Sequence, residues 1–145
     1  MPPRRSQGGV RRMERLFSRA EAEALLPTLR PLLEELQLLR QHAARLEQEM
    51  RELHWKARGN GHDHLDEELT TLQRRRESVL NELGERVDRI HALGVLVKDL
   101  DLGLIDFPHW RGQRVVYLCW KLGEDSIDWW HEVDAGYAGR QRLDA

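Results

Sequence analysis

The sequence predicts an α+β fold, in which a long antiparallel α-helical hairpin packs on a small antiparallel β-meander of three to four strands. Up to position 93, apolar residues recur at alternating spacings of three and four, which is typical of packed helices. After Gly94 the apolar residues alternate with polar ones, which is typical of strands. We therefore expect one domain over residues 13–145, with the hairpin in 13–93 and the meander and a Gly-rich tail in 94–145.

Composition and charge limit the environment and the partners. Charged residues make up 33% of the chain and apolar residues 40%, and Cys119 is the single cysteine. An intrachain disulfide is therefore excluded, and without an apolar run of about 20 residues no membrane segment is expected. We expect a cytoplasmic protein with no membrane partner.

A basic segment opens the chain. Residues 1–12 contain Arg4, Arg5, Arg11 and Arg12 and no acidic residue. Basic tails can bind nucleic acid, but this one is short and has no interleaved aromatic residues. We expect a disordered leader, or an overlong start with Met13 as the initiator, and no nucleic-acid partner.

The first helical segment has a recognisable start and two interruptions. Ser18 and Glu21 have the spacing of a capping box, which marks a helix N-terminus. Pro27 and Pro31 each lack an N–H group and crowd the preceding turn. We expect a short first helix to about residue 26 and then a bend into a long helix that ends near Arg58.

The second helical segment follows a break at residues 59–61 and begins at His62 or Asp63. Folding the two segments back on each other pairs Leu53 with Leu69 and Ala43 with Val79, which brings both apolar seams into register. Arg76 falls within the seam. We expect it to reach outward to Glu47 or Glu49; the alternative is that it sets the register or crosses an oligomer interface.

Some leucines fall outside the seam, and a two-helix hairpin is too narrow to cover them. They are Leu26, Leu33, Leu38 and Leu80. The sheet can cover part of this surface, and a second copy of the chain can cover the rest. We therefore expect a homo-oligomer, a dimer or higher.

Four strands are expected, at residues 95–98, 104–107, 114–121 and 127–133, with Pro108 ending the second. A four-residue hairpin loop would pair Trp120 with Trp129 and Leu118 with His131. These side chains would face the helices, and Trp130 would face outward.

Acidic residues gather on the opposite face of this expected sheet. If residues 108–113 form a loop, Asp106 and Asp134 flank Val115 from opposite sides, next to Glu132. Asp99 and Asp101 can lean over the same edge. Such an oxygen cluster suits a hard divalent cation, Mg²⁺, Mn²⁺ or Ca²⁺.

Two residues have competing interpretations. His131 is expected to be a core histidine, but a one-residue change of register would place it beside the acids as a ligand or base. Arg140 can bind an anionic substrate, or it can form a salt bridge by folding back onto Asp101 or Asp106. Under that second interpretation the acids form a salt-bridge network with arginines.

Several segments together resemble a bacterial family known as domain of unknown function 2203. They are residues 17–22 and 25–27, 97–101 with Gly103, 106–108, 116–120 and the tail 130–141. The resemblance implies a small cytosolic bacterial protein of undefined activity, and it supplies no catalytic residue.

Two classes of function therefore stay open. The first is a non-catalytic, oligomeric interaction or scaffold protein built on the coiled-coil-like hairpin. The second is a small divalent-metal-dependent enzyme of hydrolase type that uses the carboxylate cluster.

Overall fold

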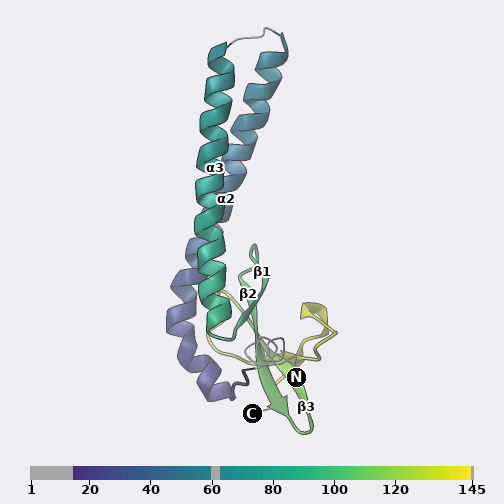
Figure 1. The fold of residues 1–145 in the computed structure, drawn as a ribbon. Helices are drawn as coiled ribbons and strands as arrows, with labels where there is room; N and C mark the ends of the chain where they lie inside the picture. The colour runs from purple at the N-terminus through teal and green to yellow at the C-terminus, as the bar shows by residue number, and fades with distance from the viewer. Residues whose placement is uncertain (1–14, 60–62, 145) are drawn as a thin grey trace, which may run out of the picture.

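The computed structural model describes residues 15–59 and 63–144 of the chain. Helices α2 (Arg19–Gly59) and α3 (Asp63–Ala92) form a long antiparallel hairpin, and a five-stranded sheet lies at the end of the hairpin away from its tip (Figure 1). The α+β prediction is confirmed. The expected leader and the expected tip beyond Gly59 lie outside the described residues. None of the described helices is long and apolar enough to cross a membrane.

The start of α2 follows the predicted capping box. The Glu21 N–H donates to Ser18 Oγ at 3.0 Å, and the Ser18 N–H donates to Glu21 Oε1 at 2.8 Å. The predicted break near residue 26 is wrong, because α2 continues through Pro27 and Pro31. The two prolines are exposed and four residues apart, so both missing hydrogen bonds fall on one side of the helix. The helix therefore bends instead of ending, and Figure 1 shows its first turns at an angle to the rest.

The two helices pack through the predicted seam. Ala43, Leu46 and Val79 are buried together, with Leu39 and Leu72 packed against them. Arg76 reaches out of the seam, and its Nε lies 2.7 Å from Glu47 Oε2, as expected.

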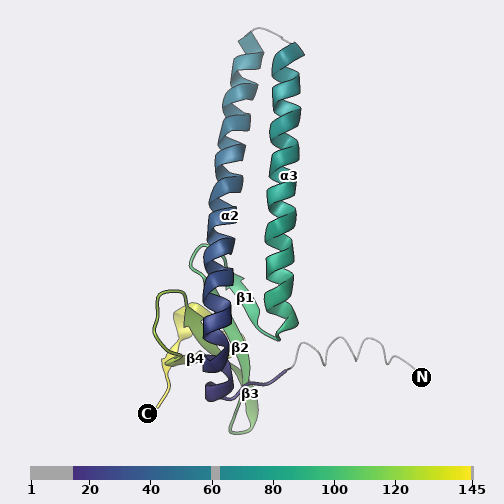
Figure 2. The same ribbon diagram turned by 90° about the vertical axis from the view of Figure 1, so that its left-hand side faces the viewer.

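The second core lies between the sheet and the adjoining parts of α2 and α3. Figure 2 shows α2 extending beyond the end of α3, with the sheet alongside that extension. Leu26 and Leu33 are buried there, so the sheet covers two of the four off-seam leucines. Leu38 and Leu80 stay 64% and 38% exposed.

All five strands pair antiparallel in chain order. They are β1 (Leu96–Asp99), β2 (Leu104–Arg111), β3 (Arg114–Lys121), β4 (Trp129–His131) and β5 (Gln141–Arg142). Pro108 lies inside β2, where a strand end was expected. It is tolerated because its carbonyl faces away from β3 and accepts a hydrogen bond from the Phe17 N–H at 2.7 Å. The missing Pro108 N–H therefore costs no bond between β2 and β3.

The predicted strand registers of β2 with β3 and of β3 with β4 are both wrong. A two-residue turn at 112–113 joins β2 to β3, with Gly112 at φ 67°, so Asp106 pairs with Cys119 and not with Val115. His131 pairs with Tyr117 instead of Leu118, a shift of one residue. The shift exchanges the two faces of β4, so Trp130 is buried in the core and Trp129 lies on the outer face.

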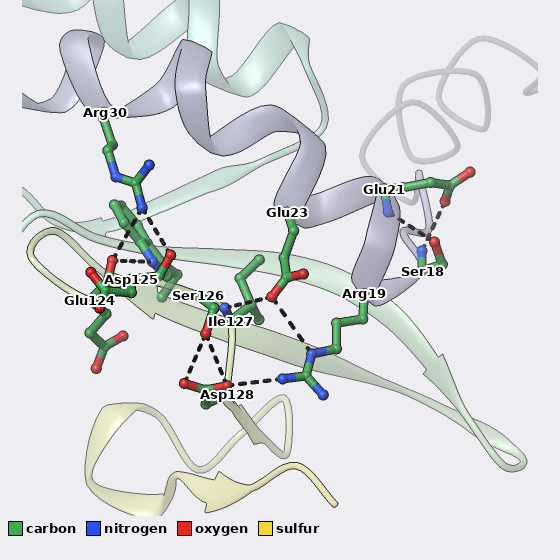
Figure 3. A network of polar contacts seen from close by, with 11 residues as sticks. Ser18, Arg19, Glu21, Glu23, Arg30, Glu124, Asp125, Ser126, Ile127 and Asp128 are labelled. Atoms are coloured by element: carbon green, nitrogen blue, oxygen red, sulfur yellow. Dashed lines mark hydrogen bonds and ion pairs between the residues drawn. The ribbon is translucent and has the colours of Figure 1, made fainter. Parts of the chain in front are cut away.

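Contacts from α2 explain the shift in β4. The Ile127 N–H donates to Glu23 Oε2 at 3.0 Å, and Arg19 Nη2 lies 2.9 Å from Asp128 Oδ1 (Figure 3). Ile127 is fully buried in the core. The segment before Trp129 is thus held by the helix, and β4 begins two residues later than a simple hairpin predicts.

Candidate functional site

Three polar side chains meet on the outer face of the central strands. Asp106 in β2 pairs with Cys119 in β3, and His131 enters from β4 on the same face, two positions along. All three are buried, with 1%, 0% and 2% of their surfaces exposed. One possible ligand atom from each lies within 4.8 Å of the other two. We call these three residues the Asp–Cys–His cluster.

The hydrogen bonds of His131 fix where its proton sits. Nδ1 lies 2.7 Å from the carbonyl oxygen of Glu132, and a carbonyl can only accept, so Nδ1 carries a proton. On a neutral ring with its proton on Nδ1, Nε2 carries no proton and presents a lone pair. It faces Asp106 Oδ2 at 3.0 Å. That contact needs a positive centre between the two atoms, either a shared proton or a metal ion.

The carboxylate of Asp106 is incompletely satisfied by the protein. Its other oxygen, Oδ1, is buried and has no hydrogen-bond partner among the described residues. Burial raises the pKa of the Asp106 carboxyl, and the neighbouring His131, Lys98 and Cys119 thiol oppose that rise. A buried carboxylate oxygen without a donor costs free energy, so this atom marks a place where a cation fits.

Cys119 is in the same environment. Burial, followed by the negative charge of Asp106, raises the pKa of the Cys119 thiol to about 12. The protein alone therefore keeps the thiol protonated and unreactive at neutral pH. A bound metal ion reverses this, because a coordinated thiol loses its proton.

A pocket of about 440 Å³ opens above the cluster. Asp106 and His131 form part of its wall, Lys98 is the cation among its lining residues, and Leu102, Leu104, Val133 and Tyr137 supply apolar surface. Lys98 Nζ lies 4.9 Å from the centre of the Tyr117 ring, on the outer face of the sheet. The wall thus combines the carboxylates of Asp99 and Asp106 and the ammonium of Lys98 with apolar groups.

The C-terminal tail closes one side of this pocket. Residues 136 and 138 line it together with Tyr137, which begins the short helix η1 (Tyr137–Gly139). Gly136 has φ 72°, a conformation that favours glycine, and it turns the chain back over the sheet.

The predicted acids Asp99, at the end of β1, and Asp101, just after it, stay apart from the cluster. Asp99 lines the pocket, but its Oδ1 accepts the Leu102 N–H at 3.0 Å and so holds the turn. Asp101 is exposed and lies 3.4 Å from Arg40 Nε.

The two predicted acids after β4 are also placed elsewhere. Glu132 forms a two-pronged ion pair with Arg114, and this hydrogen bonding lowers the pKa of the Glu132 carboxyl. Asp134 is exposed. Of the predicted metal residues, the structure therefore brings together only Asp106 and His131.

Arg140 has a structural position. Its Nη2 lies 2.7 Å from Glu124 Oε2, and its guanidinium sits 4.6 Å from the Trp129 ring and 4.8 Å from the Tyr137 ring. The expected contact with Asp101 or Asp106 is wrong, although a salt bridge is formed. Arg140 fastens the tail to the sheet and so positions Tyr137 at the pocket.

Sequence reasoning left Cys119 out of the site. No cysteine or histidine lies around Cys119 in the sequence with the spacing of a metal site. The available signal was alternation, which puts Cys119 on the same strand face as Tyr117. Cys119 reaches the site only because the observed strand register pairs it with Asp106.

Comparison with known proteins gives the family and no more. A sequence profile of the family described as uncharacterized conserved protein (DUF2203) matches residues 15–143, nearly the whole chain, so the protein belongs to that family. No curated protein and no solved structure matches it.

Proposed function

We propose that this member of the DUF2203 family binds one zinc ion through Asp106, Cys119 and His131 and acts as a small metal-dependent enzyme. The observation that carries the proposal is the convergence of three buried donors, one of them a carboxylate whose Oδ1 has no hydrogen-bond partner within bonding distance among the described residues. The carbonyl of Glu132 supports it, because zinc-binding histidines typically donate their second N–H to such a group.

The donor set favours zinc over the hard cations expected from the sequence. Mg²⁺ and Ca²⁺ prefer oxygen ligands throughout, whereas one nitrogen, one sulfur and one oxygen suit a borderline ion such as Zn²⁺. In a tetrahedral zinc site the ligand atoms lie about 3.4–3.8 Å apart. The donors of the cluster all lie within 4.8 Å of one another, and the closest pair, His131 Nε2 and Asp106 Oδ2, is 3.0 Å apart. Small side-chain shifts, which open this pair, would bring the three donors to that spacing.

Three protein ligands leave the fourth position for a water molecule, which is the arrangement of catalytic zinc sites. Zinc would supply a bound water of lowered pKa and a Lewis acid. The pocket above the cluster gives a small substrate access, and Lys98 in its wall can pair with an anionic group of that substrate. We therefore expect hydrolase-type chemistry on a small anionic molecule.

Zinc content tests the proposal directly. Protein made without a histidine tag, loaded with zinc and dialysed should retain about one zinc per chain by elemental analysis. Asp106→Asn, Cys119→Ser and His131→Asn should each lose most of it. Asp134→Asn is the matched control, because it removes an exposed carboxylate near the same strand and should retain the metal.

Two results would contradict the zinc site. One is wild-type protein that holds well below one zinc per chain after loading. The other is a Cys119→Ser and His131→Asn double variant that binds as much zinc as wild type.

A second candidate function is a homo-oligomeric scaffold, and a specific observation favours it. The hairpin carries large apolar side chains in solvent, Leu38 at 64% exposure and Trp55 at 70%. Exposed apolar surface of this kind marks contact sites between proteins. Light scattering should give a mass above the 17.1 kDa of one chain, and a single-chain mass at every concentration would exclude the scaffold.

A further inference from the structure

Two surface grooves of opposite charge run along the distal half of the hairpin. The first, which we call the basic groove, has a volume of about 640 Å³ and includes Met50, Arg51, Trp55, Arg58, Leu69 and Arg76. The second, the acidic groove, has a volume of about 550 Å³ and includes Glu49, Glu52, Leu53, Glu67, Glu68 and Leu72. Both are formed by α2 and α3 together.

The basic groove presents an aromatic ring and unpaired cations. The Trp55 ring is 70% exposed, and the Arg58 guanidinium lies 5.1 Å from its centre. Arg76 is neutralised by Glu47. Arg51 donates to the neutral Gln48, and among the described residues neither Arg51 nor Arg58 forms an ion pair. Two positive charges beside the ring therefore have no acidic partner in the part of the chain that the structure describes.

The acidic groove carries an excess of negative charge that matches the positive charge of the basic groove. Its lining contains four glutamates against Lys56 and Arg75, which leaves two negative charges. Leu53 and Leu72 are its apolar lining residues and are half-buried. Each groove thus combines an apolar strip with two net charges, and the two signs are opposite.

The grooves lie on opposite faces of the hairpin. In a helix of 3.6 residues per turn, neighbouring positions are about 100° apart, so Arg51 and Glu49 differ by about 200° around α2. Leu53 and Met50 lie near the seam with α3, one bordering each groove. A single copy therefore cannot bring its two grooves together.

We infer that the partner of the hairpin is a second copy of this chain, with the basic groove of one copy on the acidic groove of the next. The inference gives the scaffold candidate its contact surface and rests on it, and it is independent of the zinc site. Because the two surfaces differ and face opposite ways, the contact is heterologous, and each copy can join two neighbours. Such an assembly either closes into a ring or forms an open chain of copies that lengthens as the protein concentration rises.

Charge reversal with complementation tests the pairing. Arg51→Glu with Arg58→Glu makes both grooves acidic, and Glu52→Lys with Glu68→Lys makes both basic. All four sites are exposed helix positions, so both variants should fold. Each variant alone should have the mass of a single chain by light scattering in low salt. An equimolar mixture should associate again, because every contact then joins an acidic to a basic groove.

The matched control reverses two arginines outside both grooves. Arg74→Glu with Arg89→Glu changes the net charge by the same amount, and both positions are exposed on α3. This variant should associate like wild type, and wild-type association should weaken as salt screens the charges.

The possible outcomes separate the inference from the scaffold candidate. If wild type has the mass of one chain at all concentrations, both fail. If wild type associates and the groove variants associate equally well, or the mixture does not recover, the scaffold stands and the pairing of the grooves is wrong. Circular dichroism of each variant confirms that loss of association is not loss of folding.

Discussion

Asp106→Asn is the substitution that best separates a zinc site from a proton shared between Asp106 and His131. The amide has the shape of the carboxylate, and its NH₂ group can donate to His131 Nε2, which now lies 3.0 Å from Asp106 Oδ2. Nε2 can accept because Nδ1 carries the ring proton toward Glu132. The variant therefore keeps a hydrogen bond and loses a buried charge.

The expected free energies follow from this geometry. Without metal, the substitution replaces a charge-assisted hydrogen bond by a weaker neutral one, which destabilises the fold. It also removes a buried negative charge whose Oδ1 has no partner among the described residues, which stabilises the fold. These effects oppose each other, so the free energy of unfolding should change by no more than about 1–2 kcal/mol. With free zinc at 100 times its Kd, wild type should gain about 2.7 kcal/mol by linkage. For a chain of 145 residues that corresponds to a rise in Tm of about 8–11 °C.

Thermal unfolding measures both quantities. Circular dichroism follows the helices, and the buried Trp120 and Trp130 report on the sheet by fluorescence. Wild type should melt higher in zinc than in chelator, while Asp106→Asn should melt at one temperature in both. Zinc can also bind histidines of the unfolded chain, so His64→Gln serves as the control for binding away from the cluster.

The reasoning is refuted in either of two ways. If zinc leaves the Tm of wild type unchanged, the cluster holds a shared proton and no metal. If zinc raises the Tm of Asp106→Asn as much as that of wild type, the metal binds elsewhere.

Further predictions concern what holds the fold together. Leu33→Ala should lower the free energy of unfolding by about 2–5 kcal/mol because Leu33 is buried in the core, whereas the exposed Leu38→Ala should change it by less than about 0.5 kcal/mol. Equal losses in urea unfolding would show that Leu38 is covered in solution. Arg140→Ala should cost about 2–4 kcal/mol, because it removes the partner of Glu124 and a cation between two rings. Arg142→Ala, at an exposed position, should cost less than about 1 kcal/mol, and a reversed order would contradict the role given to Arg140.

The helical part was predictable because its determinants are local. The capping box at Ser18 and the apolar seam are readable within a few residues, and the pairing of Ala43 with Val79 follows from a single loop. The error at Pro27 has a tertiary cause. Packing of Leu26 and Leu29 in the core outweighs the hydrogen bonds that the two exposed prolines remove.

The site was less predictable because it depends on strand register. Asp106 and His131 were both candidates, but their contact needs the turn after Arg111 to have two residues and β4 to start at Trp129. The second condition is set by Glu23 on α2, more than a hundred positions earlier in the chain. Strand alternation in the sequence carries no signal of that contact.

The placement of the cluster bears on what the site can do. Its three donors come from β2, β3 and β4, the central strands of the sheet, whose opposite faces carry Phe107, Leu118 and Trp130 of the main core. Donors on packed strands keep their positions, and zinc affinity depends on that rigidity. The other pocket walls come from the end of β1, the β1–β2 connection, the start of β2 and the tail, and the connection and the tail can vary without disturbing the ligands. Substitutions at Lys98 or Tyr137 should therefore alter substrate preference and leave zinc content unchanged, whereas substitutions in the cluster should remove both.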